Sequence, residues 1–320
     1  MDAMHVKDPI DRLGQLRSEL EALKRRISGL ETEIFSLRED QRTFRHPVEG
    51  LLSQRGLPVI AHSDYSHTFL PATLGPAKRE IFYRLMRRYS FRLFLRDLIQ
   101  FPENADLKTL TRYCSIRTVR SYLKSLAELG MVTIGDDRGY QLVSSQISSF
   151  GPTLEWYVSE VFKREFMAPA LFNVRLHNTR FGGDYDVIAL ASGCLVYVEV
   201  KSSPPRGVEL QAVSAFLNRL RDLQPHTAAF LVDTELRMKD KIVPLFEDAL
   251  GSNGEQTGEY RVSRLVDEIF HINHYIYLVN SRKGIYSNLR TCFRDFLRGA
   301  QPAAGWTLNA STSECQPTVK

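Results

Sequence analysis

The feature that most constrains the fold is a pair of apolar runs near the middle of the chain. The first run covers residues 187–191, Ser192-Gly193 interrupts it, and the second run covers residues 195–200. Together the runs are rich in β-branched and aromatic residues, and they are separated by two residues that favour a turn. This pattern predicts a β-hairpin.

Three charged residues lie at one end of this hairpin. Asp186 begins the first run, and Glu199 and Lys201 alternate with three valines in the second, Val196, Val198 and Val200. Because successive side chains of a strand point to opposite faces, Glu199 and Lys201 should share one face and the valines the other. A hairpin register can also bring Asp186 close to Glu199. We therefore expect two carboxylates and an ammonium group to converge at the end of a largely apolar sheet.

The charged cluster has two explanations. A buried Glu and Lys are costly unless they pair with each other or bind something charged. Carboxylate oxygens from Asp186 and Glu199 would suit Mg²⁺, and Lys201 would then orient a water molecule or offset charge on a phosphate. The alternative is a solvent-facing Glu-x-Lys pair at a strand end, which is a common arrangement.

The wider pattern favours the metal site. Gly182-Gly183-Asp184-Tyr185-Asp186 opens the hairpin, and Glu199, in the sequence Val-Glu-Val-Lys, lies thirteen positions after Asp186. Over residues 150–250 this pattern resembles the PD-(D/E)xK nuclease superfamily, in particular archaeal Holliday-junction resolvases and Mrr-type restriction endonucleases. The resemblance implies a restriction-endonuclease-like mixed sheet flanked by helices, Mg²⁺ (or Mn²⁺) as cofactor, and hydrolysis of DNA phosphodiester bonds.

The resemblance also implies roles for individual residues. Asp186 and Glu199 would bind the metal ion, and Lys201 would position or activate the attacking water. Glu155, on a helix that begins at Gly151, would complete the metal shell or hold a second ion.

Three further residues are weaker candidates for the site. Gln211, on the helix that follows the hairpin, is a possible accessory residue. Asp184 competes with Asp186, and Glu160 competes with Glu155. No proline precedes the aspartate, although many members of the family also lack one.

The length and composition of the chain limit which class of protein it can belong to. The chain has 320 residues, room for about two domains, and is 43% hydrophobic and 25% charged, as in ordinary water-soluble proteins. No apolar run approaches the roughly 18 residues of a membrane helix. The four cysteines are scattered without a Cys-x-x-Cys pair, which argues against a zinc site and is consistent with a cytoplasmic protein.

Residues 8–45 carry a heptad repeat. Eight leucine and isoleucine residues are spaced alternately by three and four positions: Leu13, Leu16, Leu20, Leu23, Ile27, Leu30, Ile34 and Leu37. This is the pattern of a coiled coil, and an isolated helix has nothing to cover such a stripe. We therefore expect a homodimer through this segment, with packing of the helix on its own domain as the alternative.

Residues 77–145 are typical of a winged helix, after a linker over residues 46–76 that is rich in proline and glycine. The pattern predicts three helices and two strands, at Lys78–Leu98, Leu107–Tyr113 (capped by Asn104 or Asp106), Ile116–Leu129, Met131–Ile134 and Tyr140–Val143. A turn at residues 136–139 would form the wing.

This segment is also the most basic part of the chain. Lys78 to Arg138 contains 13 Lys and Arg against 7 Asp and Glu, a net charge of +6, whereas the whole chain carries +5. The exposed face of the third predicted helix offers Arg117, Thr118, Arg120, Ser121 and Lys124. Such side chains suit phosphate contacts and base edges of DNA. Winged helices also dock proteins, and a basic helix is often only a solvated surface.

The remainder of the chain completes the nuclease-like domain over residues 150–299. We expect a helix at Val208–Leu223, a strand at Ala228–Val232 and a helix at Leu236–Leu250. From Glu259 the pattern is helix-like, then apolar at Tyr275–Val279. Residues 280–298 mix basic and aromatic side chains, which suit either a nucleic-acid groove or a docking helix. Residues 300–320 are expected to be a disordered tail.

The sequence thus predicts a mixed α/β chain, with a coiled coil, a winged helix-turn-helix and a nuclease-like domain. Its predicted function is that of a Mg²⁺-dependent deoxyribonuclease, an endonuclease rather than an exonuclease. A catalytically inactive DNA-binding or regulatory protein that uses the nuclease fold as a scaffold is one alternative. Another is a subunit active only beside a helicase or other protein partner. Single-stranded, duplex or branched DNA and RNA are all open as substrates.

Overall fold

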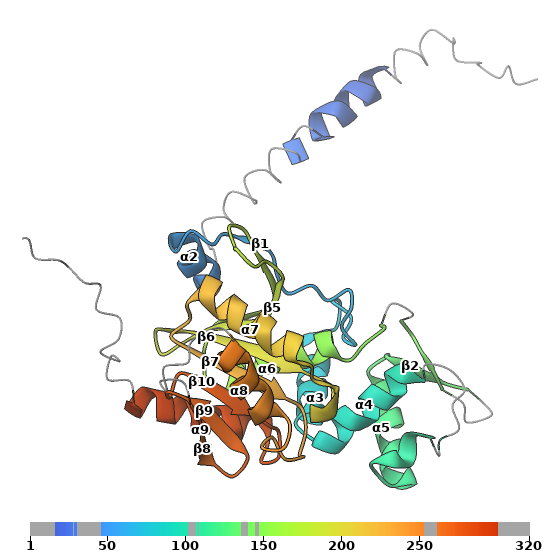
Figure 1. Ribbon diagram of the computed structural model, residues 1–320. Helices are drawn as coiled ribbons and strands as arrows, with labels where there is room; N and C mark the ends of the chain where they lie inside the picture. The colour runs from blue at the N-terminus through green and yellow to red at the C-terminus, as the bar shows by residue number, and fades with distance from the viewer. Residues whose placement is uncertain are drawn as a thin grey trace, which may run out of the picture.

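The computed structural model describes residues 17–27, 29–30, 46–101, 107, 109–135, 140–144, 147–252 and 261–299. An eight-stranded sheet forms its centre, in the order β1-β4-β5-β6-β7-β10-β9-β8 (Figure 1). Neighbouring strands are antiparallel except for the pairs β6–β7 and β7–β10, which are parallel. The predicted mixed α/β class is therefore confirmed. None of the helices among these residues is long and apolar enough to cross a membrane.

The strands of this sheet are β1 (Val59–Ala61), β4 (Ala170–Leu176), β5 (Asp184–Ala191), β6 (Cys194–Lys201), β7 (Thr227–Val232), β8 (Val262–Val266), β9 (Ile269–Ile272) and β10 (Ile276–Val279). The helices around it are α2 (Pro47–Gln54), α6 (Gly151–Glu165), α7 (Leu210–Leu223), α8 (Ile242–Ser252) and α9 (Ile285–Gly299), with a short 3-10 helix η2 (Pro205–Gly207).

The predicted hairpin is confirmed in β5 and β6. Ala191 pairs with Cys194, and the two residues between them, Ser192 and Gly193, have φ angles of 49° and 76°. Positive φ at both central residues is the geometry of a two-residue turn that matches the twist of the flanking strands. Glycine adopts this conformation without a steric penalty, which explains why the break falls here.

Two apolar cores lie on the two faces of the sheet. The valines of β6 belong to one core, with Trp156 of α6, whereas Leu195 and Tyr197 belong to the other, with Phe216 of α7. The alternation predicted for β6 is therefore confirmed. Helices α6 and α9 pack together on the valine face, and α7 and α8 pack together on the opposite face.

A helical unit precedes α6 in the chain. It consists of α3 (Pro76–Met86), α4 (Tyr89–Gln100), a 3-10 helix η1 (Thr109–Arg112), α5 (Ile116–Glu128) and the hairpin β2 (Val132–Ile134) and β3 (Tyr140–Leu142). Ser115 caps α5 by accepting a hydrogen bond from the Thr118 backbone N–H. The wing residues 136–139 and the predicted caps Asn104 and Asp106 lie outside the described residues.

The long helix predicted over Lys78–Leu98 is wrong, because the chain breaks between α3 and α4. Arg88 has extended backbone angles, and α4 starts at Tyr89. The break allows Arg92 to reach back and donate a hydrogen bond to the Met86 carbonyl at 2.7 Å, which satisfies a carbonyl at the end of α3. A continuous helix would leave this arginine pointing away from that carbonyl.

The linker predicted over residues 46–76 is also wrong in part. Pro47 opens α2, whose Val48 and Leu52 are buried one turn apart, and β1 pairs antiparallel with β4 at the edge of the sheet. Proline is well tolerated in the first turn of a helix, so it marks a start here rather than a break.

The helix-like pattern predicted from Glu259 is contradicted as well. Strands β8, β9 and β10 follow one another as an antiparallel meander, and β10 joins the sheet beside β7. Ile269 to Ile272 are buried at every position, and so are Ile276 to Val279. Strands that are covered on both faces lose the apolar–polar alternation that identifies a strand in a sequence. The helix predicted from Leu236 begins only at Ile242.

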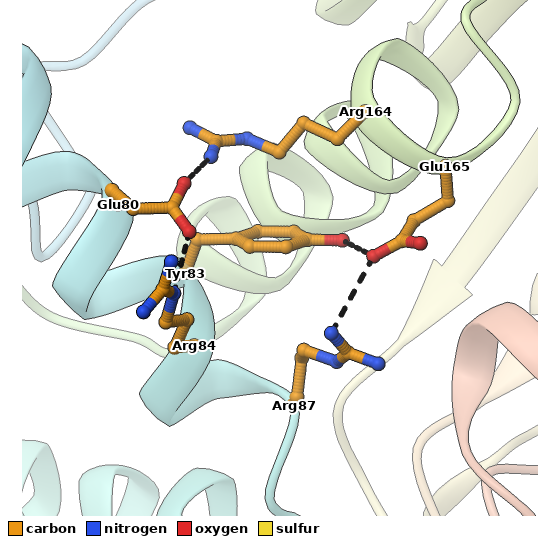
Figure 2. Close-up of a pocket in the computed structure, with 6 residues that line it drawn as sticks. All are labelled: Glu80, Tyr83, Arg84, Arg87, Arg164 and Glu165. Atoms are coloured by element: carbon orange, nitrogen blue, oxygen red, sulfur yellow. Dashed lines mark hydrogen bonds and ion pairs between the residues drawn. The ribbon is translucent and has the colours of Figure 1, made fainter.

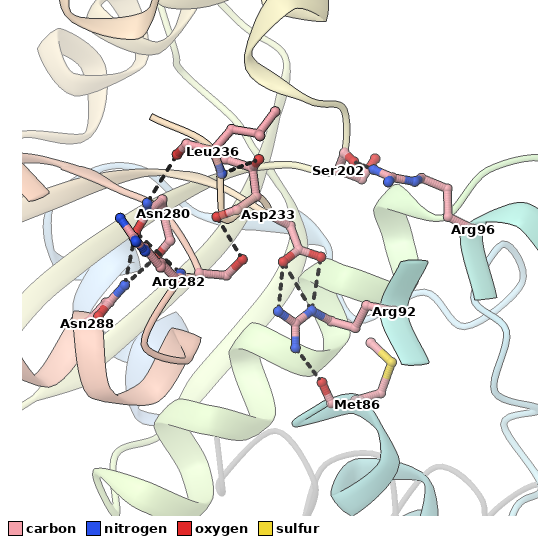
Figure 3. A network of polar contacts seen from close by, with 11 residues as sticks. Met86, Arg92, Arg96, Ser202, Asp233, Leu236, Asn280, Arg282 and Asn288 are labelled. Carbon is pink, nitrogen blue, oxygen red and sulfur yellow. Dashed lines mark hydrogen bonds and ion pairs between the residues drawn. The ribbon is translucent and has the colours of Figure 1, made fainter. Parts of the chain in front are cut away.

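A buried ion pair joins the helical unit to the sheet. Arg92 of α4 donates from Nε and Nη2 to the carboxylate of Asp233, directly after β7, at distances of 2.8–3.1 Å. Both side chains are almost fully buried, at 1% and 2% exposure. Beside this pair, Arg96 donates to the Ser202 carbonyl at 2.6 Å (Figure 3). The Asp233 N–H also donates to the Lys201 carbonyl. Helix α4 is thus fixed to the segment that follows β6.

We expect Arg92→Ala to lower the free energy of unfolding by about 3–5 kcal/mol, because Asp233 would remain buried without its partner. Arg92→Met combined with Asp233→Leu should recover most of this loss, since neither charge is then buried. Chemical denaturation measures both changes. The control is Arg84→Ala, an exposed arginine on α3, which should stay within about 0.5 kcal/mol of the parent protein. A loss below about 1 kcal/mol for Arg92→Ala would contradict this account.

Candidate active site at the end of the β5–β6 hairpin

Four of the predicted site residues come together from three elements. Glu155 lies on α6, Asp186 lies near the start of β5, and Glu199 and Lys201 lie at the end of β6. Since β5 and β6 are antiparallel, the start of one strand lies beside the end of the other. The charges of Glu155, Asp186 and Glu199 influence one another. The sheet therefore brings three carboxylates and one ammonium group to one end of the hairpin.

A local irregularity positions Asp186. Tyr185 and Val187 are two residues apart on β5, yet they pack in the cores on opposite faces of the sheet. The regular alternation is thus interrupted at Asp186, and the neighbouring strand β4 carries Asn173 with φ of 48° between the partners of these two residues. The Asp186 carboxylate accepts a hydrogen bond from the Val200 N–H at 2.6 Å. Irregularities of this kind redirect side chains in a sheet.

Glu199 is the most enclosed member of the cluster, with only 1% of its surface exposed. Lys201 Nζ donates to its Oε1 at 2.7 Å, and Arg219 Nη1 donates to both carboxylate oxygens at 3.1 and 2.9 Å. The Tyr197 hydroxyl donates to Oε2. Charge-assisted bonds from two cations offset the loss of hydration of the buried carboxylate.

The pKa values of three residues in the cluster are raised. Burial, and then repulsion from Glu199, raise the pKa of Glu155 to about 7, although Lys201 acts in the opposite direction. Burial also raises the pKa of Asp186, and repulsion from Glu199 and Glu155 adds to this. Burial alone would lower the pKa of Lys201, but Glu199 and Asp186 outweigh it and the pKa is raised. Glu155 is therefore a group that changes protonation near neutral pH.

The donor chemistry of the cluster fits a hard divalent cation. Three carboxylates supply the oxygen ligands that Mg²⁺ prefers, and the raised pKa values of Glu155 and Asp186 show that negative charge there lacks compensation. The described part of the chain nevertheless contains no group of three His, Cys, Asp or Glu residues arranged to hold a metal ion. Both Glu199 oxygens are engaged by Arg219, so the donors are present but not all free.

The remaining candidates are weaker members of the site or lie outside it, although the charge of Asp184 adds to the raised pKa of Glu155. Asp184 is exposed and pairs with Arg175 at 2.8 Å, and Glu160 pairs with Lys163 and Arg164 on its own helix. Gln211 is exposed near the start of α7, and no described contact joins it to the carboxylates.

Arg219 belongs to the cluster but was not assigned to it from the sequence. A signal for it exists, because Arg219 borders the apolar stripe of α7 formed by Phe216, Leu220 and Leu223. An arginine at the edge of a buried stripe can extend its stem over the core and bring its charge to a neighbouring strand.

The residues predicted to contact DNA lie on one helix, α5. Arg117, Arg120, Ser121 and Lys124 are exposed, and Thr118 is half-buried, with its hydroxyl 2.9 Å from that of Ser115. Thr118 therefore contacts the residue that caps the start of the helix, whereas the side chains of the other four residues are exposed to solvent.

A separate open cleft of about 540 Å³ lies between α3 and α6 (Figure 2). Its lining consists of Glu80, Tyr83, Arg84, Arg87, Arg164 and Glu165. The acidic and basic side chains there pair with one another, and none of the predicted site residues lines the cleft.

The sequence matches no protein-family model and no curated protein. Two solved structures are similar to parts of the chain. The protein VC1899 from Vibrio cholerae is 16% identical with a TM-score of 0.39, over 55% of this chain and 51% of that chain. Can2 from Sulfobacillus thermosulfidooxidans, solved in complex with cyclic tetra-adenylate, is 12% identical with a TM-score of 0.41, over 78% of this chain and 61% of that chain. The chain thus spans between half and two thirds of the length of either structure, and likeness at this level assigns neither a family nor a function.

The raised pKa of Glu155 makes stability depend on pH in a defined direction. Between about pH 4.5 and pH 7 the Glu155 carboxyl holds a proton in the folded chain but loses it in the unfolded chain, so its contribution to stability should fall as the pH rises through this window. Glu155→Gln should reduce the fall between pH 5 and pH 8 by about 1–3 kcal/mol. Urea denaturation at several pH values measures this, with the exposed Glu128→Gln on α5 as the control. Identical pH profiles for the parent protein and Glu155→Gln would show that Glu155 titrates normally.

Proposed function

We propose that this chain is a metal-dependent nuclease that hydrolyses phosphodiester bonds of DNA. The observation that carries the proposal is the convergence of Glu155, Asp186, Glu199 and Lys201 at one end of the hairpin. Carboxylates with raised pKa values beside a lysine in a largely apolar setting are typical of catalytic sites. The resemblance of the same residues to the PD-(D/E)xK pattern supports this reading.

Each side chain of the cluster would have its own role in hydrolysis. Asp186, Glu199 and Glu155 would hold Mg²⁺ or Mn²⁺, which supplies charge for the phosphate and acidifies water. Lys201 is 26% exposed on its side chain, so its ammonium group can reach a phosphate oxygen or hold the attacking water. The pKa of Glu155 is about 7 without a cation, so binding of the cation near neutral pH would release a proton from this carboxyl to solvent. The water oxygen then bonds to phosphorus as the bond to the leaving sugar oxygen breaks.

The helical unit from α3 to β3 would act as a winged helix that positions the DNA. Arg117, Arg120 and Lys124 on α5 are exposed and suit phosphate contacts in or beside a groove. The Arg92–Asp233 ion pair and the Arg96–Ser202 hydrogen bond fix this unit to the end of β6. DNA held by α5 would therefore have a defined orientation relative to Lys201.

The N-terminal helix would form a homodimer. Residues 17–27 and 29–30 are helical, and Leu20, Leu23, Ile27 and Leu30 are 52–55% exposed. The other four heptad positions lie outside the described residues. A stripe of this kind is covered when two helices pair, and a dimer would present two sites to the two strands of a duplex.

The decisive experiment compares cleavage and binding in the same variant. Lys201→Ala should leave the affinity for DNA within about twofold, because α5 is unchanged, and should reduce Mg²⁺-dependent cleavage by at least about 100-fold. Cleavage of single-stranded, duplex and branched DNA and of RNA is followed on gels, and binding by fluorescence anisotropy. Lys163→Ala, which removes a lysine paired with Glu160 on α6, is the matched control. Undiminished cleavage by Lys201→Ala would refute the assignment.

The reciprocal variant tests the winged helix in the same assays. Arg117→Glu combined with Arg120→Glu should weaken DNA binding, most strongly at low salt. Lys78→Glu with Arg84→Glu makes the same change of charge on α3 and should weaken binding less. Equal losses in the two double variants would mean that only the total charge matters.

We further expect Leu23→Glu with Ile27→Glu to convert a dimer to a monomer, because both residues lie on the apolar stripe and the new carboxylates would repel across the pair. Sedimentation equilibrium measures the mass in solution. Glu21→Gln, outside the stripe, should remain dimeric. A monomeric parent protein would contradict the proposed homodimer.

One observation favours a second function. Arg219 occupies both oxygens of Glu199, as it would in a protein that uses the nuclease fold only to bind DNA or to regulate a partner. In that case Lys201→Ala and the parent protein would bind DNA equally and neither would cleave any substrate with Mg²⁺ or Mn²⁺.

A further inference from the structure

Arg219 reaches the candidate site from α7, across the face of the sheet opposite α6. Its Nη1 donates to both oxygens of Glu199, and its side chain is 18% exposed, so part of it borders solvent. The arginine therefore lies between the buried carboxylate and the outside of the molecule.

The guanidinium group has donors that Glu199 does not use. Its Nε is buried and has no hydrogen-bond partner within the described structure. A buried unpaired donor is costly, so the position favours the arrival of an acceptor.

Gly183 leaves room beside this group. A side chain there would place its Cβ 3.2 Å from Nη2, tighter than an ordinary contact, and the backbone has φ of +93°, a conformation that favours glycine. The Gly182-Gly183 turn can therefore lie close to the edge of the guanidinium group, which a side chain at position 183 would crowd.

The balance of charge indicates what the site lacks. Glu155, Asp186 and Glu199 contribute three negative charges when ionised, and Lys201 and Arg219 contribute two positive charges, which leaves a net charge of −1. A divalent cation alone would change this to +1, whereas a divalent cation together with one phosphodiester, which carries a single negative charge, would bring it to zero. Without Arg219 the net charge would be −2, and a divalent cation alone would neutralise it.

We propose that Arg219 is a phosphate-binding residue of this site, held by Glu199 until a phosphodiester takes the place of that carboxylate, so that nucleic acid and divalent cation bind cooperatively. This inference rests on the proposed function. A guanidinium group pairs with carboxylate and phosphate oxygens through the same planar set of donors, so the exchange keeps its hydrogen bonds. After the exchange, Glu199 still has Lys201 and Tyr197 as partners and can offer an oxygen to the cation.

Binding of Mn²⁺ alone and with diethyl phosphate tests the exchange without any cleavage. Diethyl phosphate is a phosphodiester that lacks bases and sugars, and ionic strength is held constant with chloride. Free Mn²⁺ is measured by electron paramagnetic resonance. In the parent protein, diethyl phosphate should tighten Mn²⁺ binding at least about fivefold, the lower end of common coupling between two ligands.

Variants of Arg219 and of the nearby Arg221 test whether the coupling between Mn²⁺ and diethyl phosphate depends on Arg219 itself. Arg219→Gln should bind Mn²⁺ alone about tenfold more tightly than the parent protein, and diethyl phosphate should no longer change the affinity. Arg219→Lys keeps the charge but not the planar fork, and should retain only part of the coupling. Arg221→Gln, the same change two residues away on α7, where Arg221 bonds Asn218, should behave like the parent protein. Thermal unfolding verifies that each variant is folded, and Arg219→Lys carries the test if Arg219→Gln does not fold.

The outcomes distinguish this inference from the proposed function. If Glu199→Gln loses Mn²⁺ but Arg219→Gln binds it as the parent protein does, with the same response to diethyl phosphate, the role of Arg219 is refuted and the cation site stands. If no protein in the series binds Mn²⁺, both are refuted. Tighter binding by Arg219→Gln, with the coupling lost, supports the exchange.

Discussion

The burial of the Glu199 carboxylate determines which side chains gather at the end of the sheet that holds the candidate site. Glu199 is 1% exposed on a strand whose other face packs against α6, so water does not solvate it. A carboxylate in this position requires partners, and Lys201, Arg219 and Tyr197 supply them from β6 and from α7. Burial, and then repulsion from Glu199, raise the pKa values of Glu155 and Asp186. The electrostatics of the cluster therefore depend on burial and on the position of Glu199 together.

A second buried ion pair determines where the helical unit lies relative to this cluster. Asp233 follows β7, its N–H bonds the Lys201 carbonyl, and its carboxylate holds Arg92 of α4. Replacing a buried pair with apolar side chains is often neutral or stabilising, so such a pair is better understood as fixing geometry than as adding stability. Here it holds α4 against the ends of β6 and β7. The contact between the helical unit and the segment after Lys201 is therefore made through buried side chains.

The sequence predicted the parts of the fold in which local patterns and burial agree. The β5–β6 hairpin could be recognised because Ser192-Gly193 marks its turn, and the helix predicted at Ile116–Leu129 agrees with α5. Strand β9 was predicted as part of a helix-like pattern, and β10 was identified only as an apolar segment. Both faces of these strands are buried, which removes the alternation of apolar and polar residues that identifies a strand. In the site, the motif spacing placed Asp186, Glu199 and Lys201 on neighbouring strands. Arg219 could not be placed, because its role depends on how α7 crosses the sheet, and that is a property of tertiary packing.

The free-energy cost of holding these carboxylates together, partly shielded from water, bears on whether the cluster has a function. Asp186 and Glu155 are half-buried, and burial raises the pKa of both, to about 7 for Glu155, so both are less favourable when charged than an exposed carboxylate would be. Apolar or amide residues in their places would make a scaffold more stable, since proteins are readily stabilised at sites that carry such strain. A protein that only binds DNA has no physical need for one buried and two half-buried carboxylates around one lysine. A protein that must gather positive charge around a phosphodiester needs an excess of negative charge to do so, and this cluster provides it.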